Sequence, residues 1–200
     1  DVKLYANQFY DYLPYGYWDT WKYYFRFDVR TDIHLDVIRD KWSFGEVVVP
    51  GTGNNFSVTG GFGWNKTEWG KIRSCNYALD KIADMTKNDE VLRYEGEIRF
   101  FKSLLYLYLK LKPFGDVPWL ENELNIDSEE LYGARDSRKV VVENILEDLN
   151  FAIIHLPETD DSDRLTKYVA LALKVDLCLF EGTFRKYHEL GDYEQLLKEA

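Results

Sequence analysis

The fold is decided by the stretch YEGEIRFFKSL, residues 94–104. It belongs to a helical pattern that runs from about Val91 to Leu111 and is apolar on nearly every side beyond Arg99. A helix of this composition has to be buried. Gly96 within it indicates that another helix approaches closely, because glycine costs about 1 kcal/mol relative to alanine in a helix interior. We expect the helix to be ended by Pro113, Gly115 and Pro118.

Charged side chains on this helix predict ion pairs between helices. Glu97 and Arg99 fall on a helix that is otherwise buried, where an unpaired charge is costly. Each therefore needs a partner of opposite charge on another part of the chain. We expect pairs that combine Arg135 or Arg164 with Glu97 or Asp116.

Further helical patterns lie on both sides of this stretch. Before it, one apolar face begins at Glu68, and after it Asp136 or Ser137 is expected to cap a helix that stops at Pro157. Another helix opens at Thr166, and a last one follows Gly191-Asp192. Short links make neighbouring helices antiparallel. The sequence therefore predicts an all-α fold of TPR-like antiparallel hairpins, at about 69–112 and 137–186, although the strict TPR signature is absent.

The amino-terminal third has a different composition. Of the 33 aromatic residues, 18 precede residue 70. Residues 50–65 read PGTGNNFSVTGGFGWN, which predicts an irregular Gly- and aromatic-rich segment at about 45–66. We expect one helical domain over 1–200, with an aromatic-rich segment and loop at 1–68 and the hairpins at 69–200. Because the chain starts at Asp1 and ends in a helix-forming run, we expect a fragment or a processed form.

Composition and motifs argue against several classes of function. The net charge of −10 disfavours nucleic acids and a basic patch for anionic lipids. No apolar run is long enough to span a membrane. The histidines His34, His155 and His188 have no metal-ligand or nucleophile spacing, so we expect no enzyme, no metal site and no cofactor. We interpret Cys75 and Cys178 as buried free thiols.

Several motifs follow one another in a fixed order between residues 69 and 186. They are WGKIRSCNYAL at 69–79, YEGEIRFFKSL at 94–104, FGDVPW at 114–119, the run from Arg135-Asp136-Ser137 to Leu156-Pro157, and RLTK at 164–167 followed by Ala170. In residues and spacing they resemble the SusD/RagB family of nutrient-binding outer-membrane lipoproteins. Ile98, Lys102 and Ser103 depart from the residues commoner in the family and leave the helix intact. The resemblance implies a fragment of a larger SusD-like fold.

The resemblance also implies a function and a location. A SusD-like protein is expected to bind a nutrient, most often an oligosaccharide, and to deliver it to a SusC-like TonB-dependent transporter. It is expected at the cell surface, held on the outer membrane by a lipidated cysteine upstream of Asp1, so that the only link to the membrane lies outside this chain. Part of the family takes up peptides, so the ligand class stays open. A helical scaffold that binds a protein or peptide partner without recognising glycans is the alternative.

Candidate ligand-binding residues lie in the irregular segment and just before it. Sugars stack their C–H faces on aromatic rings, and their hydroxyls bond to Asn and Arg side chains. The predicted ligand-binding residues, which supply this mixture, are Arg39, Trp42, Asn54, Asn55, Trp64 and Asn65. The resemblance implies that glycan sites use aromatics of this region together with residues of the carboxy-terminal part. The alternative interpretation is that Trp42 and Trp64 pack the loop onto the helices.

Overall fold

The computed structural model describes residues 2–13, 64–160 and 162–200. The elements in these ranges are α1 (Val2–Asn7), a 3-10 turn η1 (Gln8–Tyr12), α3 (Lys66–Ala83), α4 (Asp89–Tyr106), a π-helical turn η3 (Leu107–Leu111), α5 (Lys112–Phe114), a 3-10 turn η4 (Glu129–Tyr132), α6 (Arg138–His155), α7 (Lys167–Tyr187) and α8 (Tyr193–Glu199). Within the described ranges, the only β-type pairing is an isolated antiparallel bridge between Val117 and Asp136. The all-α prediction is confirmed.

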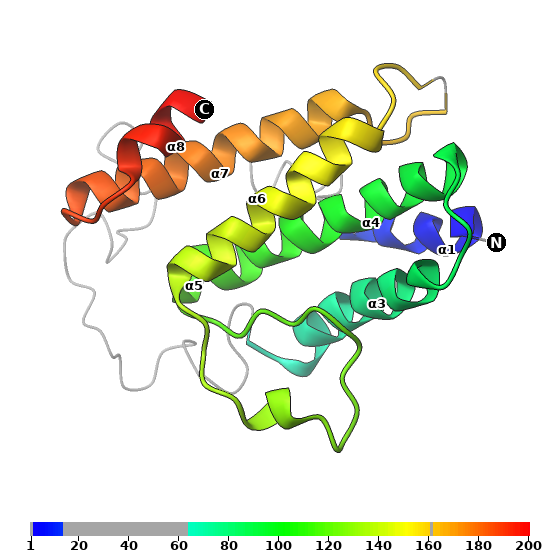
Figure 1. The fold of residues 1–200 in the computed structure, drawn as a ribbon, viewed down its shortest axis with the longest axis horizontal. Helices are drawn as coiled ribbons and strands as arrows, with labels where there is room; N and C mark the ends of the chain where they lie inside the picture. The colour runs from blue at the N-terminus through cyan, green and yellow to red at the C-terminus, as the bar shows by residue number, and fades with distance from the viewer. Residues whose placement is uncertain (1, 14–63, 161) are drawn as a thin grey trace, which may run out of the picture. The chain divides into compact units, whose positions relative to one another are not determined.

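The helices pack in sequence order. α4 lies between α3 and α6, α6 packs on α7, and α7 packs on α8, while α1 contacts α4 (Figure 1). The chain divides into two units, and this packing is within the unit formed by Asp1–Phe9 and Phe62–Ala200. The predicted hairpins correspond to α3 with α4 and α6 with α7. The prediction of a single domain over 1–200 stays a prediction.

Polar side chains set where the long helices begin. Asn65, Asn88 and Ser137 occupy the N-cap positions of α3, α4 and α6. Their side-chain oxygens accept hydrogen bonds from the backbone N–H groups three residues later. These bonds satisfy donors that the first helical turn leaves without a partner. Ser137, rather than Asp136, therefore starts α6.

α4 is the centre of the core, as its composition predicts. Eleven of its residues are buried, and Leu105 is 3% exposed. Its end differs from the prediction, because the chain continues through η3 and α5 past Pro113. Proline is accepted there because it lies in the first turn of α5, where no intrahelical N–H donor is needed. The helical run stops at Gly115, whose φ of 72° is a conformation that favours glycine.

One predicted ion pair is present and the others are not. Arg164 donates to both carboxylate oxygens of Glu97, from Nε at 3.0 Å and from Nη2 at 2.5 Å. Arg135 pairs with neither Glu97 nor Asp116; its guanidinium lies over the ring of Trp64. Asp116 instead accepts the backbone N–H of Arg138 at 2.7 Å and so caps the start of α6. The FGDVP turn therefore contributes a cap to the next long helix.

Two smaller predictions concern the cysteines and the membrane. Cys75 and Cys178 are free and buried. Burial raises the pKa of both thiols, that of Cys178 to about 11, so they stay protonated and unreactive at neutral pH. Within the described ranges, no helix has the length and apolar character needed to cross a membrane.

Candidate functional site

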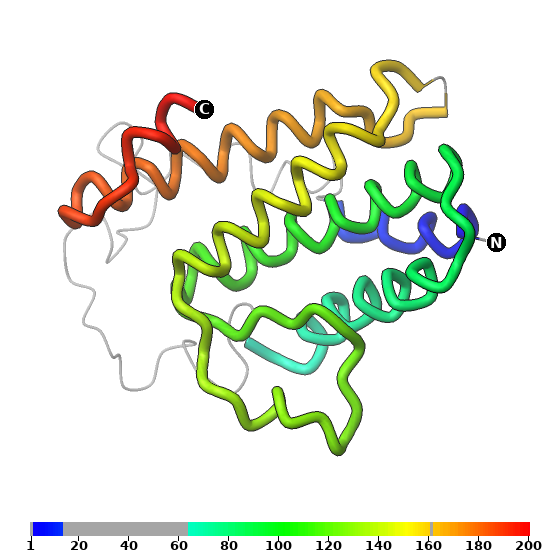
Figure 2. Tube along the Cα trace, in the orientation of Figure 1, coloured from blue at the N-terminus to red at the C-terminus, as the bar shows by residue number. Residues whose placement is uncertain are grey.

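An apolar hollow lies where the start of α3 meets the connection from α5 to α6. Figure 2 shows this connection, residues 115–137, running out beside α3 and back to α6. The hollow has a volume of about 470 Å³. Its lining is mainly apolar, with polar side chains among it: Trp64, Lys66, Trp69, Gly70, Arg73, Asn76, Pro118, Leu120, Asn122, Leu124, Glu130 and Leu131.

Two tryptophans on one side of the hollow are held by the start of α3. Asn65 caps this helix, which places Trp64 immediately before it and Trp69 one turn inside it. The Trp64 ring meets Trp69 edge to face at 5.2 Å between centroids, and meets Phe114 in the same way at 5.1 Å. These are favourable aromatic geometries. The contacts fix the orientation of the rings. Because both tryptophans are partly exposed, they can still line the hollow.

The other side of the hollow is tied to α3 by hydrogen bonds. Asn76, buried in α3, donates from Nδ2 to the carbonyl oxygens of Leu120 at 2.8 Å and Asn122 at 3.0 Å. The backbone N–H of Glu123 donates to Asp80 at 2.8 Å, and the Glu123 carboxylate accepts from Arg73 at 2.8 Å. The connection is thus bonded to α3 over two turns. The hollow is therefore formed before any ligand arrives, which lowers the ordering cost of binding.

A buried lysine lies behind the rings. Lys110, in the π-helical turn η3, has its Nζ 3.7 Å from the Trp69 centroid and 5.8 Å from the Trp64 centroid. Burial lowers its pKa to about 8, and the nearby charge of Glu68 acts in the opposite direction. Its ammonium is therefore mainly protonated at pH 7, and it contacts the ring face as a cation.

This arrangement has the chemistry of a sugar-binding surface. Aromatic rings offer stacking faces to C–H groups, and exposed polar side chains at the edge can bond to hydroxyls. The exposed polar side chains are Lys66, Arg73, Asn122 and Glu130. Among the described residues, no group of His, Cys, Asp and Glu is arranged to hold a metal ion. The hollow is suited to binding, and its polar groups show no catalytic arrangement in the described part of the chain.

The structure places two of the predicted site residues. Trp64 lines the hollow and also packs on Trp69 and Phe114, so the structure shows a packing contact, and a role of this residue in binding stays a prediction. Asn65 uses its side-chain oxygen to cap α3. The other four predicted residues lie outside the described ranges: Arg39, Trp42, Asn54 and Asn55.

Sequence reasoning missed Trp69 and the polar residues of the connection. Trp69 falls within the helical pattern that begins at Glu68, and this pattern gave no sign that the residue is only partly buried. Its position five residues after Trp64, across the start of a helix, was the available signal. Nothing in the sequence indicated that Asn122 and Glu130 lie opposite α3.

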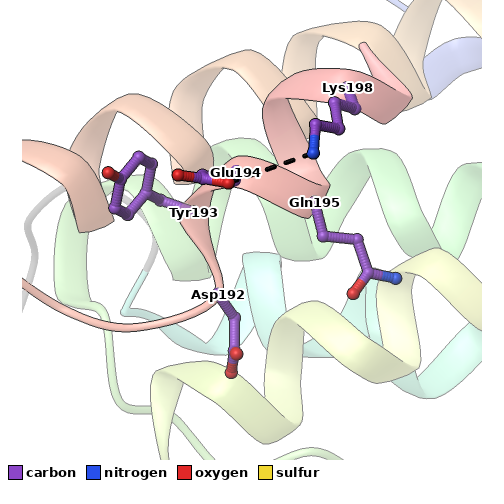
Figure 3. Close-up of a pocket in the computed structure, with 5 residues that line it drawn as sticks. All are labelled: Asp192, Tyr193, Glu194, Gln195 and Lys198. Atoms are coloured by element: carbon purple, nitrogen blue, oxygen red, sulfur yellow. Dashed lines mark ion pairs between the residues drawn. The ribbon is translucent and has the colours of Figure 1, made fainter.

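A second hollow of about 470 Å³, at the start of α8, is not a credible binding site (Figure 3). Its lining comes entirely from α8 and the residue before it: Asp192, Tyr193, Glu194, Gln195 and Lys198. Within it, Lys198 lies 3.9 Å from the Glu194 carboxylate. A single short helix gives no opposing wall to enclose a ligand.

Comparison with solved structures shows the same fold in larger proteins. A SusD-like protein from Bacteroides fragilis NCTC 9343 matches with a TM-score of 0.63 and 23% identity, over 92% of this chain and 35% of that one. A SusD-like carbohydrate-binding protein from the same organism matches with a TM-score of 0.53 and 26% identity, over 64% of this chain and 27% of that one. A laminarin-binding SusD-like protein matches with a TM-score of 0.51 and 26% identity, over 58% and 26%.

The chain spans about a quarter to a third of the length of these relatives. No match was found among curated proteins. The family model SusD-like_3, described as "Starch-binding associating with outer membrane", matches residues 29–176, well over half of the chain. The chain therefore belongs to the SusD-like family.

Proposed function

We propose that the protein binds oligosaccharides at the cell surface and delivers them to a SusC-like TonB-dependent transporter of the outer membrane. The observation that carries this proposal is the preformed hollow in which Trp64 and Trp69 meet exposed polar side chains. Family membership and the carbohydrate-binding relatives support it. The protein acts without catalysis, since its task is to hold a ligand and release it unchanged.

The same proposal includes how the protein is held at the membrane. A lipid anchor on a cysteine outside residues 1–200 attaches it to the outer membrane, which agrees with the family description. Cys75 and Cys178 do not serve as the anchor, because both are buried within helices.

Binding measurements on the intact protein test the proposal. A glycan array together with a peptide panel identifies the ligand class, and calorimetry then gives its Kd for the wild type, Trp64→Ala and Trp69→Ala. We expect each substitution to weaken oligosaccharide binding at least fivefold, with the helical circular dichroism unchanged. This corresponds to about 1 kcal/mol, the order of one aromatic stacking contact. Tyr187→Ala, at an exposed aromatic on the last turn of α7, is the matched control and should bind normally.

Two other outcomes would point away from this site. If both tryptophan variants bind the oligosaccharide normally, the binding site lies outside this hollow. In that case Trp42→Ala tests the remaining predicted platform in the same assay. Loss of the helical signal in either variant would assign its tryptophan to packing.

The helical-scaffold alternative has one observation in its favour. α7 exposes apolar side chains at Tyr168, Leu171 and Leu179, which fall along one side of the helix. A scaffold would bind no oligosaccharide on the array, and it would lose its protein partner when Leu179 is changed to Ser. Oligosaccharide binding that depends on Trp69 would exclude a scaffold with no glycan recognition.

A further inference from the structure

We propose that the binding site extends from the hollow beside Trp64 and Trp69 into a neighbouring hollow at the start of α6, so that the protein takes long, uncharged oligosaccharides in preference to disaccharides. This inference rests on the proposed function and names the class of sugar that the site takes. It is drawn from the connection of residues 115–137, because side chains of this one segment line both hollows.

The second hollow lies between the connection and the first two turns of α6. It has a volume of about 240 Å³. Its lining residues are Trp119, Leu120, Glu121, Asn122, Leu124, Glu130, Asp136, Val140 and Asn144. The residues that it shares with the hollow beside Trp64 are Leu120, Asn122, Leu124 and Glu130. The two hollows are therefore neighbours with a common wall, and a ligand that fills the first lies next to the second.

The wall of the second hollow is held in place by contacts within the protein. The two limbs of the connection are joined by the bridge between Val117 and Asp136, and the Asp136 carboxylate accepts the backbone N–H of Trp119 at 2.7 Å. The Trp119 ring packs on Tyr106 of α4, with 4.2 Å between the ring centroids. The Tyr106 hydroxyl also accepts the backbone N–H of Leu120 at 2.9 Å. A ligand therefore has little of this wall to order when it binds.

Two asparagines supply hydrogen-bonding groups to the second hollow. Asn122 is exposed and Asn144 is partly exposed, and in the described part of the chain neither amide side chain forms a hydrogen bond. Each amide has two N–H donors and one oxygen acceptor, which can pair with sugar hydroxyls. Asn122 lines both hollows, so it can bond to the sugar residue that bridges them. Asn144 lines the second hollow and not the first, so it contacts only a ligand that reaches that far.

The charges around the second hollow favour an uncharged sugar. The carboxylates that line it are those of Glu121, Glu130 and Asp136, and its described lining contains no lysine or arginine. Lys102 lies 4.5 Å from the Trp119 centroid, but it is buried, does not line the hollow and interacts with the buried Asp148 carboxylate. A carboxylate or sulfate on the ligand would meet like charge here, whereas a hydroxyl can donate a hydrogen bond to a carboxylate.

A ligand that spans both hollows gains contacts that a shorter one lacks. A disaccharide can occupy the hollow beside Trp64 and Trp69, where the aromatic rings lie. A longer chain continues past Asn122 to Asn144, and one molecule then makes both sets of contacts. The second set adds affinity without a second cost of association, because the two parts of the ligand are covalently linked. Affinity should therefore rise with chain length.

The test compares chain lengths by calorimetry on the intact protein. The probes are the disaccharides and hexasaccharides of the malto, cello, laminari and xylo series, which are all uncharged. The hexamer of oligogalacturonate is the charged reference. We expect at least one neutral series to bind, with its hexasaccharide at least fivefold tighter than its disaccharide. Oligogalacturonate should bind more weakly than that hexasaccharide.

Variants then locate the gain in affinity. For the hexasaccharide that binds best, Asn144→Ala should raise the Kd at least threefold, while the Kd of the matching disaccharide stays unchanged. Trp69→Ala should weaken both ligands, because both occupy the first hollow. Asn150→Ala is the matched control, since it removes an exposed amide from the same helix outside both hollows, and it should leave both Kd values unchanged.

Three results would overturn the inference and leave the proposed function in place. The first is a disaccharide that binds as tightly as its hexasaccharide. The second is a hexasaccharide with the same Kd for the wild type and Asn144→Ala. The third is tighter binding of oligogalacturonate than of every neutral probe. Absence of binding by all the probes would contradict the proposed function itself, and this inference with it.

Discussion

Glu97 illustrates how single residues hold this fold together. Its side chain is 0% exposed, and it accepts two hydrogen bonds from Arg164 while Arg93 lies 3.8 Å away on the same helix. A buried carboxylate is tolerated only when such partners surround it. Because Glu97 lies in α4 and Arg164 in the loop before α7, the pair ties α4 to the segment that leads into α7.

Removing the arginine of this pair should be strongly destabilising. Arg164→Met leaves the Glu97 charge buried with only the more distant Arg93, which costs about 3–5 kcal/mol. Chemical denaturation measures this as a lower midpoint. Lys139→Met breaks an ion pair whose partners are both mostly exposed, so it should cost less than about 1 kcal/mol. Equal losses in the two variants would show that Glu97 finds another partner.

Lys110 makes the free energy of unfolding depend on pH. Burial holds its pKa at about 8 in the folded protein, against about 10.4 in an unfolded chain. Between these values the unfolded chain binds more protons, so the free energy of unfolding rises with pH. From pH 7 to pH 10 the wild type should gain about 1–3 kcal/mol relative to Lys110→Met, as measured by urea unfolding. Parallel curves for the two proteins would contradict this pKa.

At the scale of elements, local sequence signals predicted where the helices lie. They did not predict features that depend on residues far apart in the sequence. Ser137 and the Gly191-Asp192 turn marked where helices begin, because a cap depends on the first turn of the helix alone. The π-helical turn at 107–111 has no such local signal. The same holds for Arg135, whose stacking on Trp64 joins residues 71 positions apart and could not be read from spacing.

In the candidate site, too, local features could be predicted from the sequence and tertiary contacts could not. Trp64 was predicted because its segment is irregular and polar, which is a local property. The partner wall could not be predicted, since it depends on Asn76 bonding to carbonyls more than 40 residues away. The sequence thus indicated one lining residue, Trp64, and the rest of the hollow depends on tertiary contacts.

Two helical glycines make a matched pair for testing how closely the helices approach. A Cβ at Gly96 would lie 3.5 Å from the backbone of Ala152 in α6, which is an ordinary contact. A Cβ at Gly182 in α7 would lie 2.8 Å from the Leu197 side chain in α8, which requires a shift. Gly96→Ala should therefore stabilise by up to about 1 kcal/mol through helix propensity.

Gly182→Ala gains the same propensity and loses about 1–3 kcal/mol to overpacking. Its denaturation midpoint should fall below that of Gly96→Ala, and hydrogen exchange should quicken mainly in α8. A Gly96→Ala variant that is the less stable of the two would mean that α4 and α6 cannot accommodate a methyl group. The close approach predicted from Gly96 would then be tighter than the structure shows.

At the scale of the whole molecule, the elements that form the hollow also form part of the core. α3 buries Ile72 and Cys75 against the core while Trp69 and Arg73 of the same helix line the hollow. The connection on the other side is bonded to α3 and continues into α6. A ligand that bridges the two walls therefore stabilises contacts that unfolding must break.

This shared support predicts a thermal signature of binding. A ligand present at ten times its Kd stabilises the folded state by about 1.4 kcal/mol. For a chain of this size each kcal/mol shifts the melting temperature by about 2–4 °C, so the bound oligosaccharide should raise it by about 3–6 °C. Single aromatic sites are weak, so millimolar ligand is needed. Trp69→Ala should abolish most of the shift at the same ligand concentration while Tyr187→Ala keeps it. If the shift survives Trp69→Ala, the ligand binds elsewhere on the protein. The variant removes only the Trp69 ring, so undiminished stabilisation would mean that the ligand does not contact this ring.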